Sequence, residues 1–137
     1  MIFLDTSAIY AMADRADPHH HRAVELFRHA LEAGEDVLVH SYILIEAAAL
    51  LQSRLSLASA LRFLREASAF HLHWIGPHEH QQAVTLLEQR RRRDLSLVDC
   101  ASFGVMQEYK VEKAIAFDPD FEREGFTLYG TPSPSAG

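Results

Sequence analysis

Hydrophobic residues along this 137-residue chain fall into short runs that alternate with longer stretches of helical spacing. Runs of strand length predict strands near residues 2–4, 37–39, 71–74, 113–117 and 127–129. Between them, apolar positions recur every three or four residues, which predicts helices near residues 6–13, 18–33, 42–53, 57–64, 78–90 and 96–109. The pattern therefore predicts strands that are separated by helices.

Local signals place several of the helix boundaries. Asp17 and Pro18 are typical of an N-cap and a first helical residue, and Ser41 is a candidate N-cap for the helix after the second strand. Ser96 and Asp99 match a capping box, in which an acid in the first turn reaches back to the main-chain N–H of the N-cap residue.

Strands connected through helices favour a parallel sheet with helices on both faces. The predicted fold is therefore α/β, a three-layer α/β/α sandwich with a mostly parallel central sheet. The length fits one domain, which we place at residues 1–130, and the Pro- and Ser-rich residues 131–137 are expected to form a disordered tail. Ligands of such sheets bind beyond the carboxyl ends of the strands, so a site is expected there.

Four acidic residues lie within or directly after apolar segments: Asp5, Glu46, Asp99 and Asp118. Charged side chains are rarely buried without a partner, and no lysine or arginine stands beside these four. Converging carboxylates would repel one another, and a bound cation would remove that penalty. Because hard oxygen ligands favour Mg²⁺ or Mn²⁺, the set predicts a site for one of these ions.

Each acid also has a structural explanation that the sequence leaves open. Asp5 can cap the helix that follows it, Asp99 can complete the capping box, and Asp118 can begin a turn. Glu46 can pair with a distant arginine. On this alternative the chain is a non-catalytic α/β binding module whose acids are structural caps and salt bridges.

Composition narrows the range of partners. The net charge of −6 argues against a broad basic surface for nucleic acid, although the four consecutive arginines at residues 90–93 offer a local phosphate contact. No apolar run approaches the roughly 20 residues that span a bilayer, and the single cysteine, Cys100, cannot form an internal disulfide. A cytoplasmic protein with no membrane contact is expected. None of the nine histidines has a strong zinc-binding spacing, and the triplet at residues 19–21 is expected to be a solvated helix start.

Four short motifs occur in a fixed order: Leu4-Asp5-Thr6-Ser7-Ala8, Ser41 with Glu46, Asp94-Leu95-Ser96-Leu97-Val98-Asp99-Cys100-Ala101, and Ala116-Phe117-Asp118-Pro119-Asp120-Phe121. Together they resemble the motifs of PIN-domain nucleases and cover nearly the whole chain. The size and element order are similar to those of small bacterial and archaeal members, many of which are VapC-type toxins of type II toxin–antitoxin pairs.

This resemblance implies that Asp5, Glu46, Asp99 and Asp118 form an acidic site for Mg²⁺ or Mn²⁺, and that the hydroxyl of Thr6 helps to order it. The fourth motif often has a threonine at the position of Ala116, so the place of Asp118 is open to Asp94 or Asp120. The implied activity is metal-dependent hydrolysis of RNA by a ribonuclease toxin. An antitoxin protein and a second copy of the chain are the expected partners, with apolar positions between residues 42 and 64 as the candidate contact surface.

Overall fold

The computed structural model describes residues 1–131, so the predicted tail lies, apart from Thr131, outside the described residues. Its elements, in chain order, are β1 (Ile2–Leu4), α1 (Thr6–Ala13), α2 (His20–Glu32), β2 (Val37–His40), α3 (Ser41–Arg54), α4 (Leu57–Glu66), the 3-10 helix η1 (Ala67–Ala69), β3 (His71–His73), α5 (Pro77–Arg90), α6 (Leu97–Glu108), β4 (Lys113–Ile115), α7 (Asp120–Arg123) and β5 (Thr127–Leu128). Every predicted strand and helix is present. The 3-10 helix η1 and the one-turn helix α7 are additions.

The five strands form a single sheet in the order β3-β2-β1-β4-β5, and every pair of neighbours is parallel. The predicted α/β fold with a parallel sheet is therefore confirmed. Because β1 lies between β2 and β4, the residues that follow β1 and β4 emerge side by side. The main-chain N–H of Asp5 donates to the carbonyl of Ile115 at 3.1 Å, which fixes this arrangement at the carboxyl edge.

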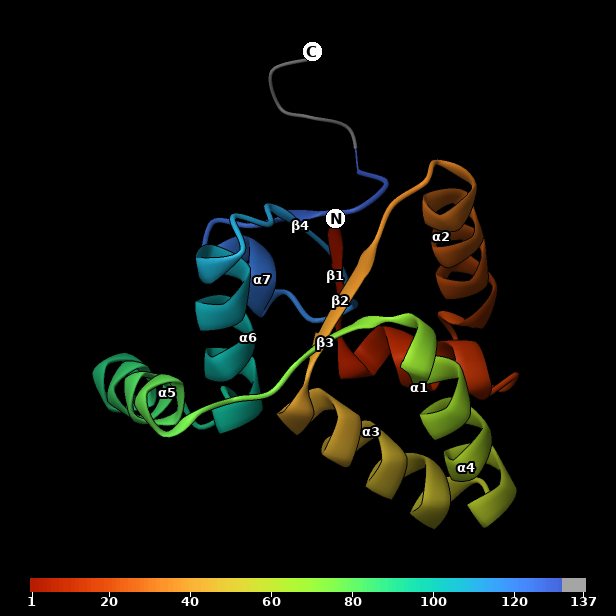
Figure 1. Ribbon diagram of the computed structural model, residues 1–137, viewed down its shortest axis with the longest axis horizontal. Helices are drawn as coiled ribbons and strands as arrows, with labels where there is room; N and C mark the ends of the chain where they lie inside the picture. Colours follow the sequence, from red (N-terminus) through yellow and green to blue (C-terminus); the bar gives the residue numbers. More distant parts are fainter. Residues whose placement is uncertain (132–137) are drawn as a thin grey trace.

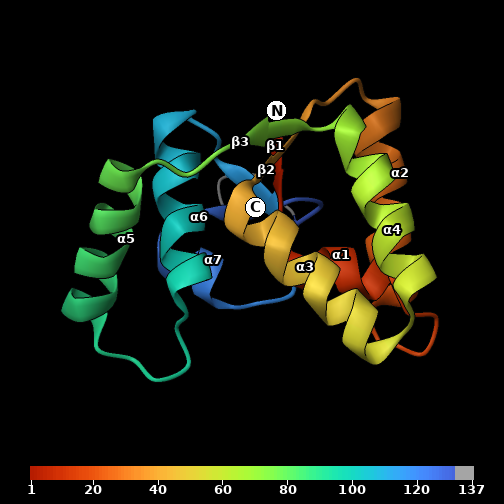
Figure 2. The same cartoon turned by 60° about the horizontal axis from the view of Figure 1, so that its bottom comes forward.

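Helices cover both faces of the sheet. Figure 1 shows α1, α2 and α4 on one side and α5, α6 and α7 on the other, and the turned view in Figure 2 agrees. The central strands are fully buried between these layers, with Phe3, Leu4, Leu38 and Ile115 among the largest buried side chains. Among the described residues, no helix is both long enough and apolar enough to cross a bilayer.

Two of the three predicted caps are wrong. Asp17 accepts the N–H of His19 at 2.8 Å and forms a turn ahead of α2, which begins at His20. Ser41 is the first residue of α3 and not its cap, because the buried imidazole of His40 takes that role. The hydroxyl of Ser41 instead accepts the N–H of Ile75, at 2.9 Å.

The capping box at α6 is confirmed. Ser96 Oγ accepts the N–H of Asp99, and Asp99 Oδ2 accepts the N–H of Ser96, both at 3.0 Å. This reciprocal pair fixes the start of α6 and the direction of the Asp99 carboxylate.

Candidate metal centre

Asp5 ends β1 and is held by the next turn of the chain. Its Oδ2 accepts the Ser7 hydroxyl at 2.6 Å and the Ser7 N–H at 3.1 Å, while that hydroxyl accepts the N–H of Phe117 at 3.0 Å. Burial raises the pKa of Asp5 to about 6, and the nearby charges of Asp99 and Asp118 act in the same direction against the hydrogen bonds from Ser7. Asp5 therefore caps α1 and at the same time lies close to other acidic side chains.

Three other acids meet at the same edge. Asp99 from α6, Asp118 after β4, and Asp120 at the start of α7 each present a carboxylate oxygen, and these oxygens lie within 4.8 Å of one another. Burial raises the pKa of Asp99, and it also raises the pKa of Asp118, to which the charge of Asp99 adds. The structure thus brings Asp99 and Asp118 together with Asp120, and it places Asp5 close enough for the charges of Asp99 and Asp118 to act on it.

Asp120 is almost fully buried because two arginines neutralise it. Its Oδ1 accepts Arg92 Nη2 from the loop after α5, and Arg123 Nη1 from α7 at 3.1 Å. Burial opposes the charge of Asp120, but these hydrogen bonds outweigh it and lower its pKa. From the sequence, Asp120 was an alternative to Asp118, and no local pattern indicated that it pairs with Arg92, 28 positions earlier.

All four carboxylates share one arrangement. Each has one oxygen anchored by a protein donor: Oδ2 of Asp5 by Ser7, Oδ2 of Asp99 by Ser96, Oδ1 of Asp118 by the N–H of Asp120 at 2.9 Å, and Oδ1 of Asp120 by the arginines. Within residues 1–131 no N–H or O–H group donates to the second oxygen of these carboxylates, and the carboxyls of Asp118 and Asp120 contact each other. The acids are therefore oriented, with half of their oxygens left for a ligand.

Glu46 lies apart from this cluster. It is exposed on α3 and makes no hydrogen bond or ion pair within the described residues. The expectation that its apolar neighbours indicate burial is wrong, because Ile45 beside it is also exposed, by 63%.

Thr6 and Asp94 do not join the four acids either. Thr6 is buried, and its Oγ1 has no hydrogen-bond partner within residues 1–131, so the contact that orders Asp5 comes from Ser7. Asp94 is exposed and lies 3.4 Å from Arg92 Nε and 4.0 Å from Arg123 Nη1. It therefore shares the arginines of Asp120 from the solvent side.

The arginine run divides into two pairs. Arg90 holds Glu124 through two hydrogen bonds of 2.8 and 3.0 Å, and Arg92 holds Asp120. Arg91 and Arg93 are exposed and form no ion pair with the described residues. Within the described part of the chain, Arg91 and Arg93 therefore keep their charge available for another molecule.

Comparison with known proteins identifies the family. Residues 2–126 match the model of the PIN domain. The chain belongs to the PIN domain family. The resemblance seen in the four sequence motifs is thereby confirmed, and the acids above lie in a PIN domain.

Several relatives of this PIN domain come from Mycobacterium tuberculosis. The 23S rRNA-specific endonuclease VapC20 is 30% identical over 128 residues, which make up 92% of this chain and 95% of VapC20. Ribonuclease VapC26 is 27% identical over 120 residues, or 85% of this chain and 86% of VapC26.

Solved structures agree with these relatives. The crystal structure of VapC20, described as a sarcin–ricin loop cleaving toxin, superposes with a TM-score of 0.81 at 28% identity and covers 93% of this chain and 97% of VapC20. VapBC2 from Rickettsia felis has a TM-score of 0.65 at 15% identity, with coverage of 93% and 97%, and shows the same fold.

Proposed function

We propose that this PIN domain is a metal-dependent endoribonuclease that hydrolyses RNA phosphodiester bonds and acts as the toxin of a toxin–antitoxin pair. The observation that carries the proposal is the set of four carboxylates, each with one oxygen anchored and one free. Caps and salt bridges alone would not require that carboxylate oxygens of Asp99, Asp118 and Asp120 converge.

The donor set fits Mg²⁺ or Mn²⁺. All the ligands are carboxylate oxygens, which these hard cations prefer. Burial raises the pKa values of Asp5, Asp99 and Asp118, and for each of them the charge of a neighbouring aspartate adds to this effect, while the direct arginine contacts of the cluster go to Asp120. A divalent ion would supply the missing positive charge.

The roles of the residues follow from their positions. A bound ion would lower the pKa of a coordinated water and offset phosphate charge. Asp99 and Asp118 would hold it, Asp5 would bind it or one of its waters through Oδ1, and Ser7 would keep Asp5 in place. Glu46, outside the cluster in this structure, is proposed to contribute by orienting water or substrate.

Relatives supply the first candidate substrate. VapC20 is named for its action on 23S rRNA, and its identity to this chain extends over nearly the whole of both proteins. We therefore propose ribosomal RNA as the substrate to test first, which places the activity in the cytoplasm.

A protein partner is proposed from the apolar surface of α3 and α4. Ile45, Leu57, Leu61 and Leu64 are exposed by 40–63%, which is unusual for large apolar side chains on neighbouring helices. We propose that an antitoxin segment or a second copy of the chain covers these residues.

The decisive experiment measures cleavage of 23S rRNA by purified protein in Mg²⁺ or Mn²⁺ against EDTA. Wild type, Asp5→Asn and Asp118→Asn are compared with Asp94→Asn, a matched control whose acid is exposed. Cleavage that needs the metal, Asp5 and Asp118 but not Asp94 supports the proposal. Absence of cleavage on any RNA, together with absence of metal binding by calorimetry, favours the non-catalytic module.

A further inference from the structure

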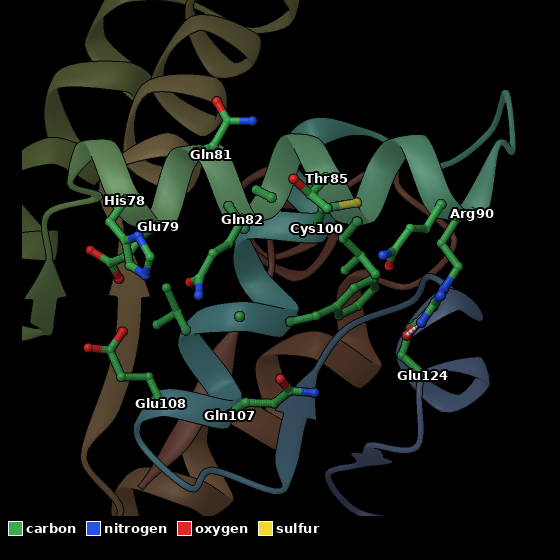
Figure 3. A pocket seen from close by; sticks show the side chains of 17 residues that line it. His78, Glu79, Gln81, Gln82, Thr85, Arg90, Cys100, Gln107, Glu108 and Glu124 are labelled. Carbon is green, nitrogen blue, oxygen red and sulfur yellow. Dashed lines mark hydrogen bonds and ion pairs between the residues drawn. The ribbon is translucent and has the colours of Figure 1, made fainter.

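Helices α5 and α6 pack around a pocket of about 740 Å³ that no part of the proposed nuclease site uses. Figure 3 shows Glu79 and Glu108 at one end of this pocket and the Arg90–Glu124 ion pair at the other. The middle of the pocket is lined by polar side chains such as Gln82 and Thr85. The pocket therefore has ionisable groups at both of its ends.

The end formed by Glu79 and Glu108 also contains an imidazole. His73, the last residue of β3, directs Nε2 to Oε2 of Glu79 at 2.5 Å and lies 4.0 Å from Oε2 of Glu108. One nitrogen and two carboxylate oxygens thus lie within 4.8 Å of one another. They come from three elements, because Glu79 stands in the first turn of α5 and Glu108 ends α6.

Groups outside the cluster fix two of its members. His73 Nδ1 lies 2.7 Å from the Tyr109 hydroxyl, and Glu79 Oε1 accepts the N–H of Gly76 at 3.0 Å. The other atom of each group, Nε2 of His73 and Oε2 of Glu79, is thereby aimed at the shared point. Metal-binding histidines are typically held in this way through the second ring nitrogen.

The charges of the cluster are unbalanced. Two carboxylates face one imidazole, and among residues 1–131 neither Glu79 nor Glu108 has an ion pair with a lysine or arginine. Contact with Glu79 raises the pKa of Glu108, as expected for two carboxylates that meet without a cation. A divalent ion between them would relieve this repulsion.

We propose that His73, Glu79 and Glu108 bind a Zn²⁺ ion at a second site, which ties the end of the edge strand β3 to α5 and α6. Three protein ligands with one position left for water is an established zinc arrangement, and the imidazole distinguishes this site from the all-oxygen cluster of Asp99. Tetrahedral zinc places neighbouring ligand atoms about 3.4 Å apart. His73 and Glu79 would move apart on binding, and Glu108, which is half exposed, would move in.

The two sites are independent. Asp99 lies in the first turn of α6 and Glu108 at its end, roughly 13 Å apart at ~1.5 Å per residue. The second site therefore does not rest on the proposed nuclease function, and failure of either leaves the other standing.

The test is calorimetric titration with Zn²⁺ combined with thermal unfolding. An Asp99→Asn/Asp118→Asn protein removes ion binding at the acidic cluster, and Glu108→Gln and His73→Gln are each added to it. We expect one Zn²⁺ bound and a rise in Tm of roughly 5–10 °C at a hundred times Kd. Both effects should be lost with Glu108→Gln, whose exposed and isosteric side chain leaves folding intact.

Two controls make the result specific. His21→Gln, which changes an exposed histidine in the first turn of α2, should keep the full Tm rise, and Mg²⁺ in place of Zn²⁺ should give none. Zn²⁺ affinity that is unchanged by Glu108→Gln, absence of Zn²⁺ binding in the parent protein, or an equal effect of Mg²⁺ would each overturn the proposal.

Discussion

The hydroxyl of Ser7 lies 2.6 Å from Oδ2 of Asp5 and at the same time accepts the N–H of Phe117 at 3.0 Å. This one side chain connects the carboxyl ends of β1 and β4, where the acids gather. The neighbouring hydroxyl of Thr6, to which the family resemblance assigned the ordering of the site, is buried without a partner in residues 1–131. The two hydroxyls can therefore be separated by experiment.

Ser7→Ala should reduce RNA cleavage by about 10- to 100-fold, because Asp5 loses the contact that orients it. Thr6→Val should keep most of the activity and raise the free energy of unfolding by about 1 kcal/mol, since it removes an unpaired buried hydroxyl. Single-turnover cleavage and urea unfolding would measure the two effects. A loss of cleavage with Thr6→Val as large as that with Ser7→Ala would return the ordering role to Thr6.

Asp5→Asn should abolish cleavage and stabilise the metal-free protein. The pKa of Asp5 is raised to about 6 in the fold from 3.8 in the unfolded chain, so the folded protein binds a proton more tightly. Between these values stability falls as pH rises, and above pH 6 the full cost of about 3 kcal/mol is present. Denaturant unfolding in EDTA at pH 7 should show this gain for Asp5→Asn, and the gain should shrink towards pH 4. Equal stability of the two proteins at pH 7 would contradict it.

The sequence predicted the fold, and the gathering of Asp5, Asp99 and Asp118 at one edge of the sheet, because both depend on local patterns. Short apolar runs separated by helical periods favour a parallel sheet, and Asp5 and Asp118 stand one and three residues after its central strands. Ser96 and Asp99 form a capping box whose partners are three residues apart. Such signals are contained within one turn or one strand.

The incorrect or missing predictions concern residues whose burial and contacts depend on how the helices and strands pack. Ile45 and Glu46 lie on a face of α3 that no other element of residues 1–131 covers, so apolar neighbours did not indicate burial. Asp120 is buried because Arg92 reaches it from another loop. His73, Glu79 and Glu108 meet only after β3, α5 and α6 have packed. None of these relationships has a fixed spacing along the chain.

His40 should make the protein sensitive to acid. Its Nδ1 accepts the N–H groups of Tyr42 and Ile43, so Nε2 carries the proton and donates to Ser102 Oγ at 2.8 Å. Burial lowers the pKa of His40 to about 3, while the unfolded value is 6.5. Between these values only the unfolded chain binds the proton. His40 therefore lowers the free energy of unfolding by up to about 1.4 kcal/mol for each pH unit of acidification.

His40→Asn keeps a side-chain acceptor for the start of α3 but cannot take up a proton. It should therefore flatten the loss of stability between pH 6.5 and 4.5, a window in which Asp5 acts with the opposite sign. Urea unfolding of His40→Asn and wild type at several pH values in EDTA would test this. Parallel pH profiles would show that another group is responsible.

Arg91 and Arg93 should contact the RNA backbone. They are the exposed half of the arginine run, because Arg90 and Arg92 are held by Glu124 and Asp120. Arg91 has a left-handed backbone with φ of 49°. Because Gln also has a Cβ atom, replacing Arg91 by Gln leaves the conformational energy of this backbone position unchanged. Arg91→Gln/Arg93→Gln should therefore weaken RNA binding without altering the fold.

The measurement is binding of a single-stranded RNA to the cleavage-deficient Asp5→Asn protein at increasing salt. Loss of two phosphate contacts should reduce the slope of log K against log salt by about 1.4, at ~0.7 per contact. Arg28→Gln/Arg65→Gln, on helices α2 and α4 of the other layer, makes the same change in net charge at exposed positions and should leave the slope unchanged. If both pairs lowered the slope equally, the arginines would act only through overall charge, and the RNA would have no defined path past the end of α5.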